Sequence, residues 1–215
     1  AGGAGILAPG EFAVAVGCVF GAAIGNKAVF WIEMPHLFAQ HWPSLTLLVG
    51  GQSMVGGVLG GLIGVELAKK MTGILRSTGD FFVFPILLGL VIGRIGCFLA
   101  GLADGTFGLP TDLPWGVDFG DGIPRHPTQL YEIAFAALLA AGLRWLQPRL
   151  APVSGLLFKL MLCSYLLWRL LIDGLKPVPY AYPGGLSGIQ WVCLIALLIY
   201  LPITWRAARS LEKTA

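Results

Sequence analysis

The sequence is poor in charged residues, which make up 12% of its 215 residues, whereas 56% are hydrophobic. A soluble domain usually carries about 25% charged residues, so an ordinary soluble protein is excluded. The net charge of +3 comes mostly from lysines and arginines in loops, and no nucleic-acid partner is expected. Neither a cofactor nor a metal is expected. The pattern of a signal peptide is not visible near Ala1.

A disulfide framework is also not expected. All four cysteines fall inside predicted membrane spans, where free thiols are favoured over bridges. These residues are Cys18, Cys97, Cys163 and Cys193.

The sequence contains several long apolar runs. Runs near 20 residues with few charges are typical of membrane-spanning helices, and several follow one another here. The sequence therefore predicts an all-α, polytopic membrane helix bundle, a single domain over residues 1–215 embedded in the lipid bilayer. Six spans are expected at about 11–33, 46–68, 81–103, 128–147, 153–174 and 187–205, with a long loop at 104–127 and a short turn at 147–149.

Basic residues are concentrated in the loops of one side, which the positive-inside rule makes the cytoplasmic side. This side holds Lys69, Lys70, Arg76, Arg144, Arg149, Arg206, Arg209 and Lys213. The other side holds Arg125 and Lys176 together with Asp104, Asp112, Asp118 and Asp121. Both ends of the chain are therefore expected in the cytoplasm and the 104–127 loop outside.

Glycines recur at four-residue spacing in each of the first two spans, which allows another helix to approach the span closely. They are Gly17, Gly21, Gly25, Gly56, Gly60 and Gly64. Four polar or small residues at 50–53 interrupt the second span. Irregular backbone at membrane depth needs protein or a water-filled cavity to satisfy it, so residues 50–57 form either a cavity wall or a simple helix kink. Lys27 either snorkels to the interface or contacts a lipid phosphate.

Four charged residues lie near the outer ends of spans three to five. Such a charge costs at least about 2.5–3.5 kcal/mol on insertion scales. They are Arg94, Glu132, Arg169 and Asp173. The last two are spaced i,i+4 and can pair. The group is either a salt-bridge network that orients helices or an anion pocket open to the outer leaflet. Arginine forks match a phosphate, and lipid-facing spans around the site favour a phospholipid.

Three segments around the long loop resemble the prolipoprotein diacylglyceryl transferase family. They are Gly93-Arg94-Ile95-Gly96, Pro114-Trp115-Gly116-Val117 and Arg125-His126-Pro127-Thr128-Gln129-Leu130-Tyr131-Glu132. The glycine-rich residues 50–57 and the Arg169–Asp173 pair, where the family has Arg-x-x-x-Glu, are also similar. The resemblance implies a multi-pass enzyme of the bacterial inner membrane with a periplasmic active face. Its members move diacylglyceryl from phosphatidylglycerol to the cysteine thiol of a lipoprotein precursor and release glycerol phosphate.

The resemblance also implies roles for individual residues. Arg94 and Arg169 would hold and neutralise the phosphate leaving group, with Asp173 orienting Arg169. Arg125 and Glu132 would anchor the ends of the loop and of the fourth span. The residues expected to bind substrate are Gly51, Ser53, Gly56, Gly57, Cys97, Asp104, Arg125 and Glu132.

The sequence departs from the family pattern at several positions. Val55 stands where the family has a histidine, and Cys97 where it has an asparagine. The family's Asn-Gly-Glu is replaced in residues 100–104, and its first helix does not precede residue 11. Because a thiol acceptor must be deprotonated, either His126 or Asp104 serves as the base or the acceptor differs. His126 can alternatively cap or pack at a helix start.

These departures leave alternatives open. Cys97 lies one turn from Arg94 and is either a packed free thiol or a nucleophile that the arginine activates. The protein as a whole is either a transferase acting on a lipoprotein precursor, a paralogue acting on another acceptor, or a non-catalytic lipid-binding membrane subunit.

Overall fold

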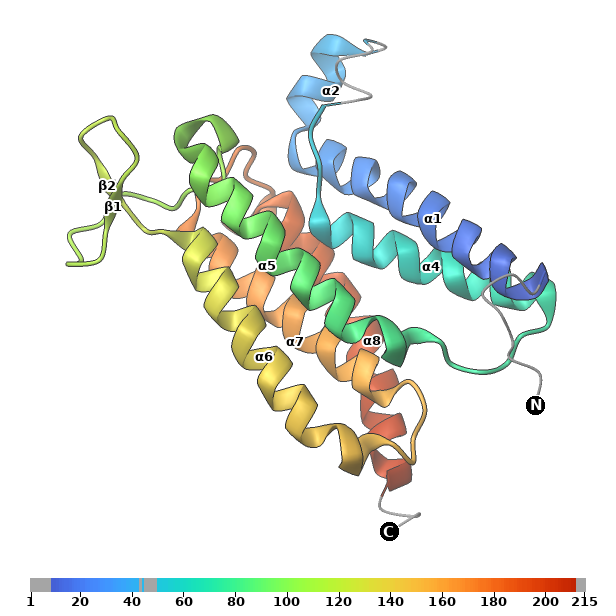
Figure 1. Ribbon diagram of the computed structural model, residues 1–215. Coiled ribbons are helices and arrows are strands. Elements are labelled where there is room, and N and C mark those ends of the chain that lie inside the picture. The colour runs from blue at the N-terminus through green and yellow to red at the C-terminus, as the bar shows by residue number, and fades with distance from the viewer. Residues whose placement is uncertain (1–8, 43, 45–49, 212–215) are drawn as a thin grey trace. The chain divides into compact units, whose positions relative to one another are not determined.

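The computed structural model describes residues 9–42, 44 and 50–211, and these residues are predominantly helical (Figure 1). The predicted all-α class is confirmed. The chain forms two compact units, Ala1–Arg76 with Pro179–Val192 and Ser77–Val178 with Cys193–Ala215. Among the described residues, three helical segments are long and apolar enough to cross a membrane: Gly10–Glu33, Gly79–Asp104 and Gly188–Leu211. The protein is thus a helical membrane protein.

In the first unit, α1 (Pro9–Glu33) and α4 (Met54–Thr72) pack through their glycines. An added Cβ on Gly17, Gly21 or Gly25 would run into the backbone oxygen of Gly64, Gly60 or Gly56, respectively. The pairing order is antiparallel, and each glycine removes the side chain that would hold the backbones apart. The predicted use of both glycine faces for close helix packing is confirmed, and the structure shows that the two faces pack on each other.

The start of α4 differs from the prediction of a span beginning near 46. Residues 50–53 are not helical, α4 begins only at Met54, and the predicted residues 46–49 lie outside the described residues. The Ser53 Oγ caps the helix by accepting from the Gly56 N–H at 3.4 Å. Its own N–H donates to Asn26 Oδ1 at 2.6 Å. A polar cap therefore starts the helix, because Ser at this position satisfies a free backbone donor.

Lys27 satisfies the backbone just before this cap. Its Nζ donates to the carbonyl oxygens of Gly50 and Gly51, both at 2.7 Å. Gly51 has φ +68°, and a Cβ there would collide with the Phe30 ring. The lysine is therefore bound to the backbone of its own unit, which neither sequence alternative for it anticipated.

The first unit also holds shorter elements between its long helices. Helix α2 (Pro35–His41) lies between the first two predicted spans, and η4 (Pro183–Gly185) precedes α8 (Gly188–Leu211). The Tyr182 hydroxyl donates to the Ile32 carbonyl at 2.7 Å, which ties the segment before α8 to the end of α1.

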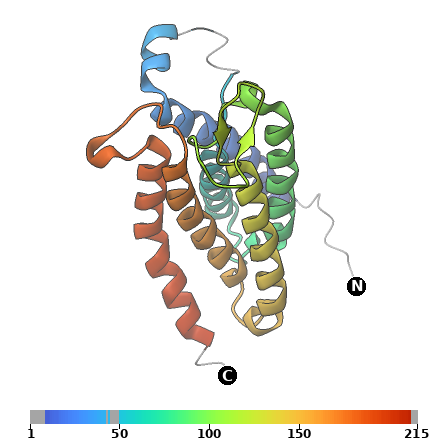
Figure 2. The same ribbon diagram turned by 90° about the vertical axis from the view of Figure 1, so that its left-hand side faces the viewer.

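The second unit is built mainly from long helices that lie side by side (Figure 1, Figure 2). Its helical elements are η1 (Gly79–Phe82), α5 (Val83–Ala100), η2 (Gly101–Asp104), α6 (Thr128–Leu150), α7 (Leu156–Ile172), η3 (Asp173–Leu175) and the later part of α8. Helix α7 lies between α6 and α8 in both views. The Phe135 and Trp168 rings stack between α6 and α7, with centroids 4.5 Å apart. The side chains of Leu156, Leu162 and Leu166 are fully buried.

Helix α6 continues to Leu150, so the predicted turn at 147–149 is wrong. Pro148 lies in the last turn of the helix. The Ala151 N–H still donates to the Gln147 carbonyl at 3.1 Å, so this turn is closed although Pro148 itself has no N–H to donate. The chain turns only afterwards, at Gly155, whose φ is +82°.

Helix α7 begins with a cap supplied from far along the chain. Asp80 accepts from the N–H of Gly155 at 2.6 Å and from that of Phe158 at 2.9 Å. A carboxylate at a helix N-terminus meets free N–H donors and the positive end of the helix dipole. Asp80 thus ties the start of α5 to the start of α7.

The C-terminal half of α8 lies beside the N-terminal half of α7. Cys163 Sγ lies 3.3 Å from Thr204 Oγ1. Cys163 is seven positions after Leu156, where α7 begins, and Thr204 is seven positions before Leu211, where α8 ends. The two helices are therefore antiparallel here. All four cysteines are free thiols, as predicted.

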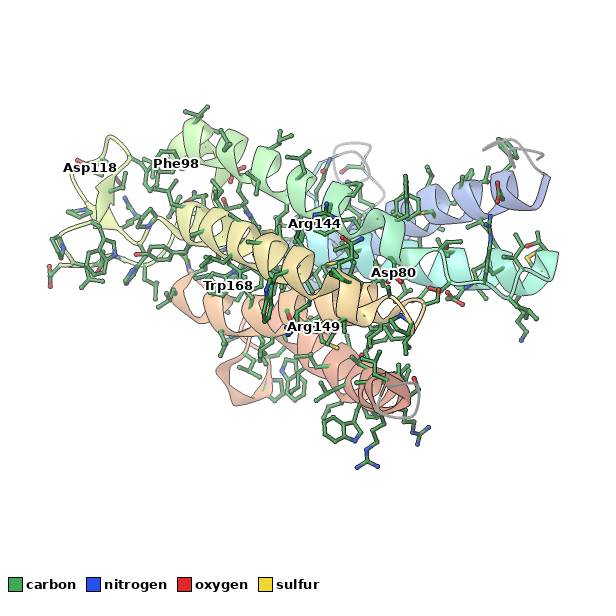
Figure 3. The ribbon with its side chains drawn as sticks, turned by 60° about the horizontal axis from the view of Figure 1, so that its bottom comes forward. Asp80, Phe98, Asp118, Arg144, Arg149 and Trp168 are labelled. Carbon is green, nitrogen blue, oxygen red and sulfur yellow. The ribbon has the colours of Figure 1, made fainter. Side chains whose placement is uncertain are left out.

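The predicted loop at 104–127 contains a small hairpin that the sequence did not indicate. Strands β1 (Val117–Asp118) and β2 (Pro124–Arg125) pair antiparallel, with Val117 opposite Arg125. The Asp118 Oδ1 accepts from three backbone N–H groups of the turn, at Gly120, Asp121 and Gly122. Figure 1 shows the hairpin projecting beyond the ends of α5 and α6. Figure 3 shows Asp118 at this end.

Candidate active site

Glu132 is the centre of a buried ion cluster in the second unit. Its side chain is 0% exposed and lies in the second turn of α6. Its Oε2 accepts from Arg94 Nε at 2.6 Å, and its Oε1 accepts from Arg169 Nη1 at 2.8 Å and from Lys176 Nζ at 2.7 Å. One carboxylate therefore joins α5, α6, α7 and the segment after η3.

Asp173 completes the cluster. Its Oδ1 accepts from Arg169 Nη2 at 2.8 Å, which confirms the i,i+4 pair predicted from the sequence. The cluster holds three cations and two carboxylates, so its formal charge is +1. A buried excess of charge is unfavourable unless another group neutralises it. An anion of the size of a phosphate would do so.

Two arginines retain donors that the cluster does not use. Among the described residues, the Nη atoms of Arg94 have one contact, to Cys97 Sγ at 3.9 Å. The buried Nε of Arg169 has no hydrogen-bond partner in that part of the chain. Glu132 thus holds both guanidinium groups in place while donors remain for a further acceptor, which suits bidentate recognition of phosphate.

Lys176 was missed by the sequence interpretation, which counted it only among the loop cations. Burial, together with the charges of Arg169 and Arg94, lowers its pKa from the usual 10.5 to about 8, although Glu132 opposes this shift. The single sequence signal was its position three residues after Asp173. That spacing does not reveal Glu132 as its partner, because 44 residues separate the two.

The start of the long loop is tied to the first turn of α6. Asp104 accepts a hydrogen bond from the Thr106 hydroxyl. The Thr128 Oγ1 donates to the Thr106 carbonyl at 2.8 Å, and Gln129 Nε2 lies 3.5 Å from Thr106 Oγ1. The side chains of Thr106 and Gln129 therefore connect Asp104 to α6. Gln129 lies on the same face of α6 as Glu132, the centre of the ion cluster.

His126 lies at the other end of the loop. Its Nδ1 is 3.3 Å from the Tyr131 hydroxyl, which also accepts from Trp115 Nε1 at 2.7 Å. Its main chain pairs with Gly108 and Leu109. Among the described residues, these contacts connect His126 to the loop and to Tyr131 in the first turn of α6, and not to Glu132.

Arg125 belongs to the hairpin and does not join the ion cluster. It forms two hydrogen bonds of 2.7 Å with Asp121 and lies over the Phe107 ring, 4.9 Å from its centroid. These hydrogen bonds raise the pKa of Arg125 and hold that of Asp121 below its usual value. Among the described residues, Arg125 thus contacts the loop, whereas Glu132 binds the cations. Their expected roles as anchors of the loop and of the fourth span stay predictions.

The predicted glycine-rich residues lie in the first unit and have identifiable local contacts. Gly51 packs on Phe30, Ser53 caps α4 and Gly56 contacts Gly25, whereas a Cβ on Gly57 would meet nothing within 4 Å. Val55 is buried. Substrate binding by Gly51, Ser53, Gly56 and Gly57 stays a prediction, as it does for Cys97 and Asp104.

A family model described as prolipoprotein diacylglyceryl transferase matches residues 11–206. The chain belongs to this family. Proteins named phosphatidylglycerol–prolipoprotein diacylglyceryl transferase are among its relatives. That of Bordetella bronchiseptica is 32% identical over 192 residues, which cover 85% of this chain and 71% of the relative. That of Nitrosomonas europaea is 32% identical over 202 residues (90% and 70%), and that of Clostridium tetani is 33% identical over 196 residues (87% and 77%).

Family membership agrees with the resemblance found in the sequence motifs. The family's name describes transfer of a diacylglyceryl group to a prolipoprotein. Of the residues expected to act in it, four lie together in the ion cluster: Arg94, Glu132, Arg169 and Asp173. His126 and Arg125 lie in the loop, and the glycine-rich residues lie in the other unit.

Proposed function

We propose that this protein is a phosphatidylglycerol–prolipoprotein diacylglyceryl transferase of the bacterial inner membrane. The observation that carries the proposal is the buried cluster of formal charge +1, in a chain of this family. The substrates are phosphatidylglycerol and the cysteine of a lipoprotein precursor. The protein is a single membrane domain of six spans, with the 104–127 loop and the site facing the periplasm.

The reaction is a displacement at carbon. The acceptor thiolate attacks the glycerol carbon that bears the phosphate, the C–S bond forms and the C–O bond breaks. The electron pair of that bond leaves with the phosphate oxygen, so that glycerol phosphate departs with one more negative charge than the phosphodiester had. The proton of the thiol goes to a base beforehand. Catalysis therefore depends on a cation at the departing oxygen and on a positioned thiolate.

Arg94 meets the first requirement best. Its Nε is fixed by Glu132 at 2.6 Å, and its Nη atoms remain beside Cys97. Arg169 is held by two carboxylates, Glu132 and Asp173. We assign Arg94 to the departing phosphate oxygen and Arg169 to the fixed positive charge behind it. Charge placed in advance where negative charge develops is worth much more in a buried site than in water.

The base is assigned to Asp104. It is connected through Thr106 and Gln129 to the helix turn that carries Glu132, whereas the His126 ring contacts Tyr131. Val55, where the family has a histidine, is buried and carries no titratable group. This substitution favours a second candidate, a paralogue that transfers the same group to another acceptor.

The proposal can be tested by incubating the purified protein with a lipobox peptide and phosphatidylglycerol labelled in the headgroup. We expect release of glycerol phosphate that requires the peptide cysteine, with a matching thioether product. A Cys-to-Ser peptide is the substrate control. Release of glycerol phosphate that does not require the peptide cysteine would favour the paralogue. Lipid binding without any release of glycerol phosphate would favour a lipid-binding subunit.

Arg94→Ala is the decisive variant, and we expect its turnover to fall by about 10²–10³-fold or more, as for loss of one transition-state donor. Lys70→Ala is the matched control, because Lys70 is an exposed cation on α4. Wild-type turnover in Arg94→Ala would refute the role given to Arg94.

A further inference from the structure

The end of the second unit opposite the ion cluster carries two matching pairs of tryptophan and arginine. On α6, the Arg149 guanidinium lies 4.5 Å from the centroid of the Trp145 ring. On α8, the Arg209 guanidinium lies 5.2 Å from the centroid of the Trp205 ring. Both pairs are spaced i,i+4, so each arginine lies over a ring one turn before it.

The two pairs lie at the same end of the unit. Helix α6 ends at Leu150 and α7 begins at Leu156 after a short turn. The Cys163–Thr204 contact shows that the last turns of α8 lie beside the first turns of α7. Figure 1 and Figure 2 show the end of α8 beside the turn between α6 and α7. Trp145 and Trp205 are five and six residues from the ends of their helices. At 1.5 Å per residue, the rings are therefore at nearly equal depth.

The surface around these pairs is exposed and positively charged. The side chains of Trp145 and Trp205 are 66% and 60% exposed. Arg144 and Arg206, next to the tryptophans in the chain, are exposed as well. Residues 140–160 and 200–211 contain no aspartate or glutamate. The nearby carboxylate of Asp80 accepts backbone hydrogen bonds from α7. Figure 3 shows Arg144 and Arg149 on α6 and Asp80 at this end.

We propose that this tryptophan–arginine surface, made of Arg144, Trp145, Arg149, Trp205, Arg206 and Arg209, binds the phosphate headgroups of anionic phospholipids. Their leaflet is the one opposite the ion cluster. Exposed indole rings at one depth near helix ends are typical of the membrane interface. A guanidinium over an indole face is held in place and keeps its N–H groups for an acceptor. Positive charge beside the rings favours anionic headgroups over zwitterionic ones.

The occupant is a lipid rather than a soluble acidic protein, because the rings lie on helices of a membrane bundle. The inference is independent of the proposed reaction. The surface lies near the ends of α6 and α8, whereas Glu132 and Arg169 lie near the start of α6 and the end of α7. A lipid held here is a structural ligand and takes no part in transfer.

The test measures lipid retention by native mass spectrometry of the full chain released from micelles. The micelles contain phosphatidylserine or phosphatidylcholine. We expect wild type to retain phosphatidylserine in preference to phosphatidylcholine. In Arg149→Gln/Arg209→Gln the affinity should fall roughly fivefold for each arginine, as expected for one cation at an anionic surface. Trp145→Leu/Trp205→Leu, which keeps the charge, should also weaken retention.

The matched control is Lys70→Gln/Arg76→Gln, which removes the same number of charges from the other unit. It should retain phosphatidylserine as wild type does. A control that weakens retention as much as the arginine pair, or equal retention of both lipids by wild type, would overturn the proposal. Turnover with phosphatidylglycerol in the arginine variant should stay within about twofold of wild type. Loss of turnover with unchanged lipid retention would also contradict the proposal, since the surface would then serve the reaction.

Discussion

Arg94 and Glu132 are joined by a hydrogen bond of 2.6 Å between Nε and Oε2, although 38 residues separate them in the chain. The bond leaves both Nη atoms of Arg94 outside the contact with Glu132. The same carboxylate binds two further cations through its other oxygen. A single acidic side chain therefore contacts all three positive charges of the cluster.

Replacing Glu132 by glutamine should strongly destabilise the protein. Three buried cations would lose their shared carboxylate, and breaking a buried pair costs about 3–5 kcal/mol. Thermal unfolding in detergent measures the effect, and turnover should be lost as well. Asp121→Asn serves as the control because its pair with Arg125 is in the exposed hairpin, and it should change the unfolding midpoint much less. Equal effects of the two substitutions would contradict the central role of Glu132.

Lys176 should make both turnover and stability depend on pH near 8. Burial lowers its pKa to about 8 from 10.5, so the charge of the cluster falls as the pH rises through 8. Turnover, which depends on this positive charge to hold the phosphate of the lipid, should therefore decline as the pH rises through this value. Between about pH 8 and 10.5 the unfolded chain binds the proton that the folded chain has lost, so the free energy of unfolding should rise with pH.

Lys176→Arg is the control for this behaviour, since arginine stays charged throughout the range. Its turnover should not decline near pH 8, and its stability should lack the rise between pH 8 and 10.5. The groups that contact or influence Lys176 are Glu132, Arg169 and Arg94. A decline of turnover at the same pH in the variant would assign the titration to another group.

Comparing Asp104→Asn with His126→Gln should identify the base. If Asp104 takes the thiol proton, Asp104→Asn should lower kcat by about 10²–10⁴-fold. His126→Gln should lower kcat much less, because the contact of the His126 ring is with Tyr131. The opposite pattern would transfer the role to His126.

The packing of α1 on α4 can be tested with two glycines of the same helix. Gly60→Ala should destabilise the protein by about 1–3 kcal/mol, because its Cβ would meet the Gly21 carbonyl and approach Gly25 Cα to 2.8 Å. Gly57→Ala should be neutral or stabilise by up to about 1 kcal/mol, since nothing lies within 4 Å of its Cβ. Unfolding midpoints of the two variants measure the difference. Similar midpoints would show that the glycine contact does not limit stability.

The sequence by itself determined the features that depend on short spacing. Apolar runs of about 20 residues predicted helices, and the four-residue glycine spacing predicted a face for close helix packing on both α1 and α4. The i,i+4 spacing of Arg169 and Asp173 predicted their ion pair. The motifs around Arg94 and at 125–132 indicated the family, to which the chain belongs. Each of these signals comes from residues that are close to one another in the chain.

The tertiary structure decided which charges meet. Glu132 binds partners 37 to 44 residues away on three other segments, and no local pattern distinguishes it from an anchor of its own helix. For the same reason the sequence missed Lys176 in the cluster and did not show that Arg125 stays in the hairpin with Asp121. It also missed the cap on α7, since Asp80 and Gly155 are 75 residues apart. Helix geometry follows from neighbours in the chain, whereas a buried ion cluster requires the packing of several helices around one carboxylate.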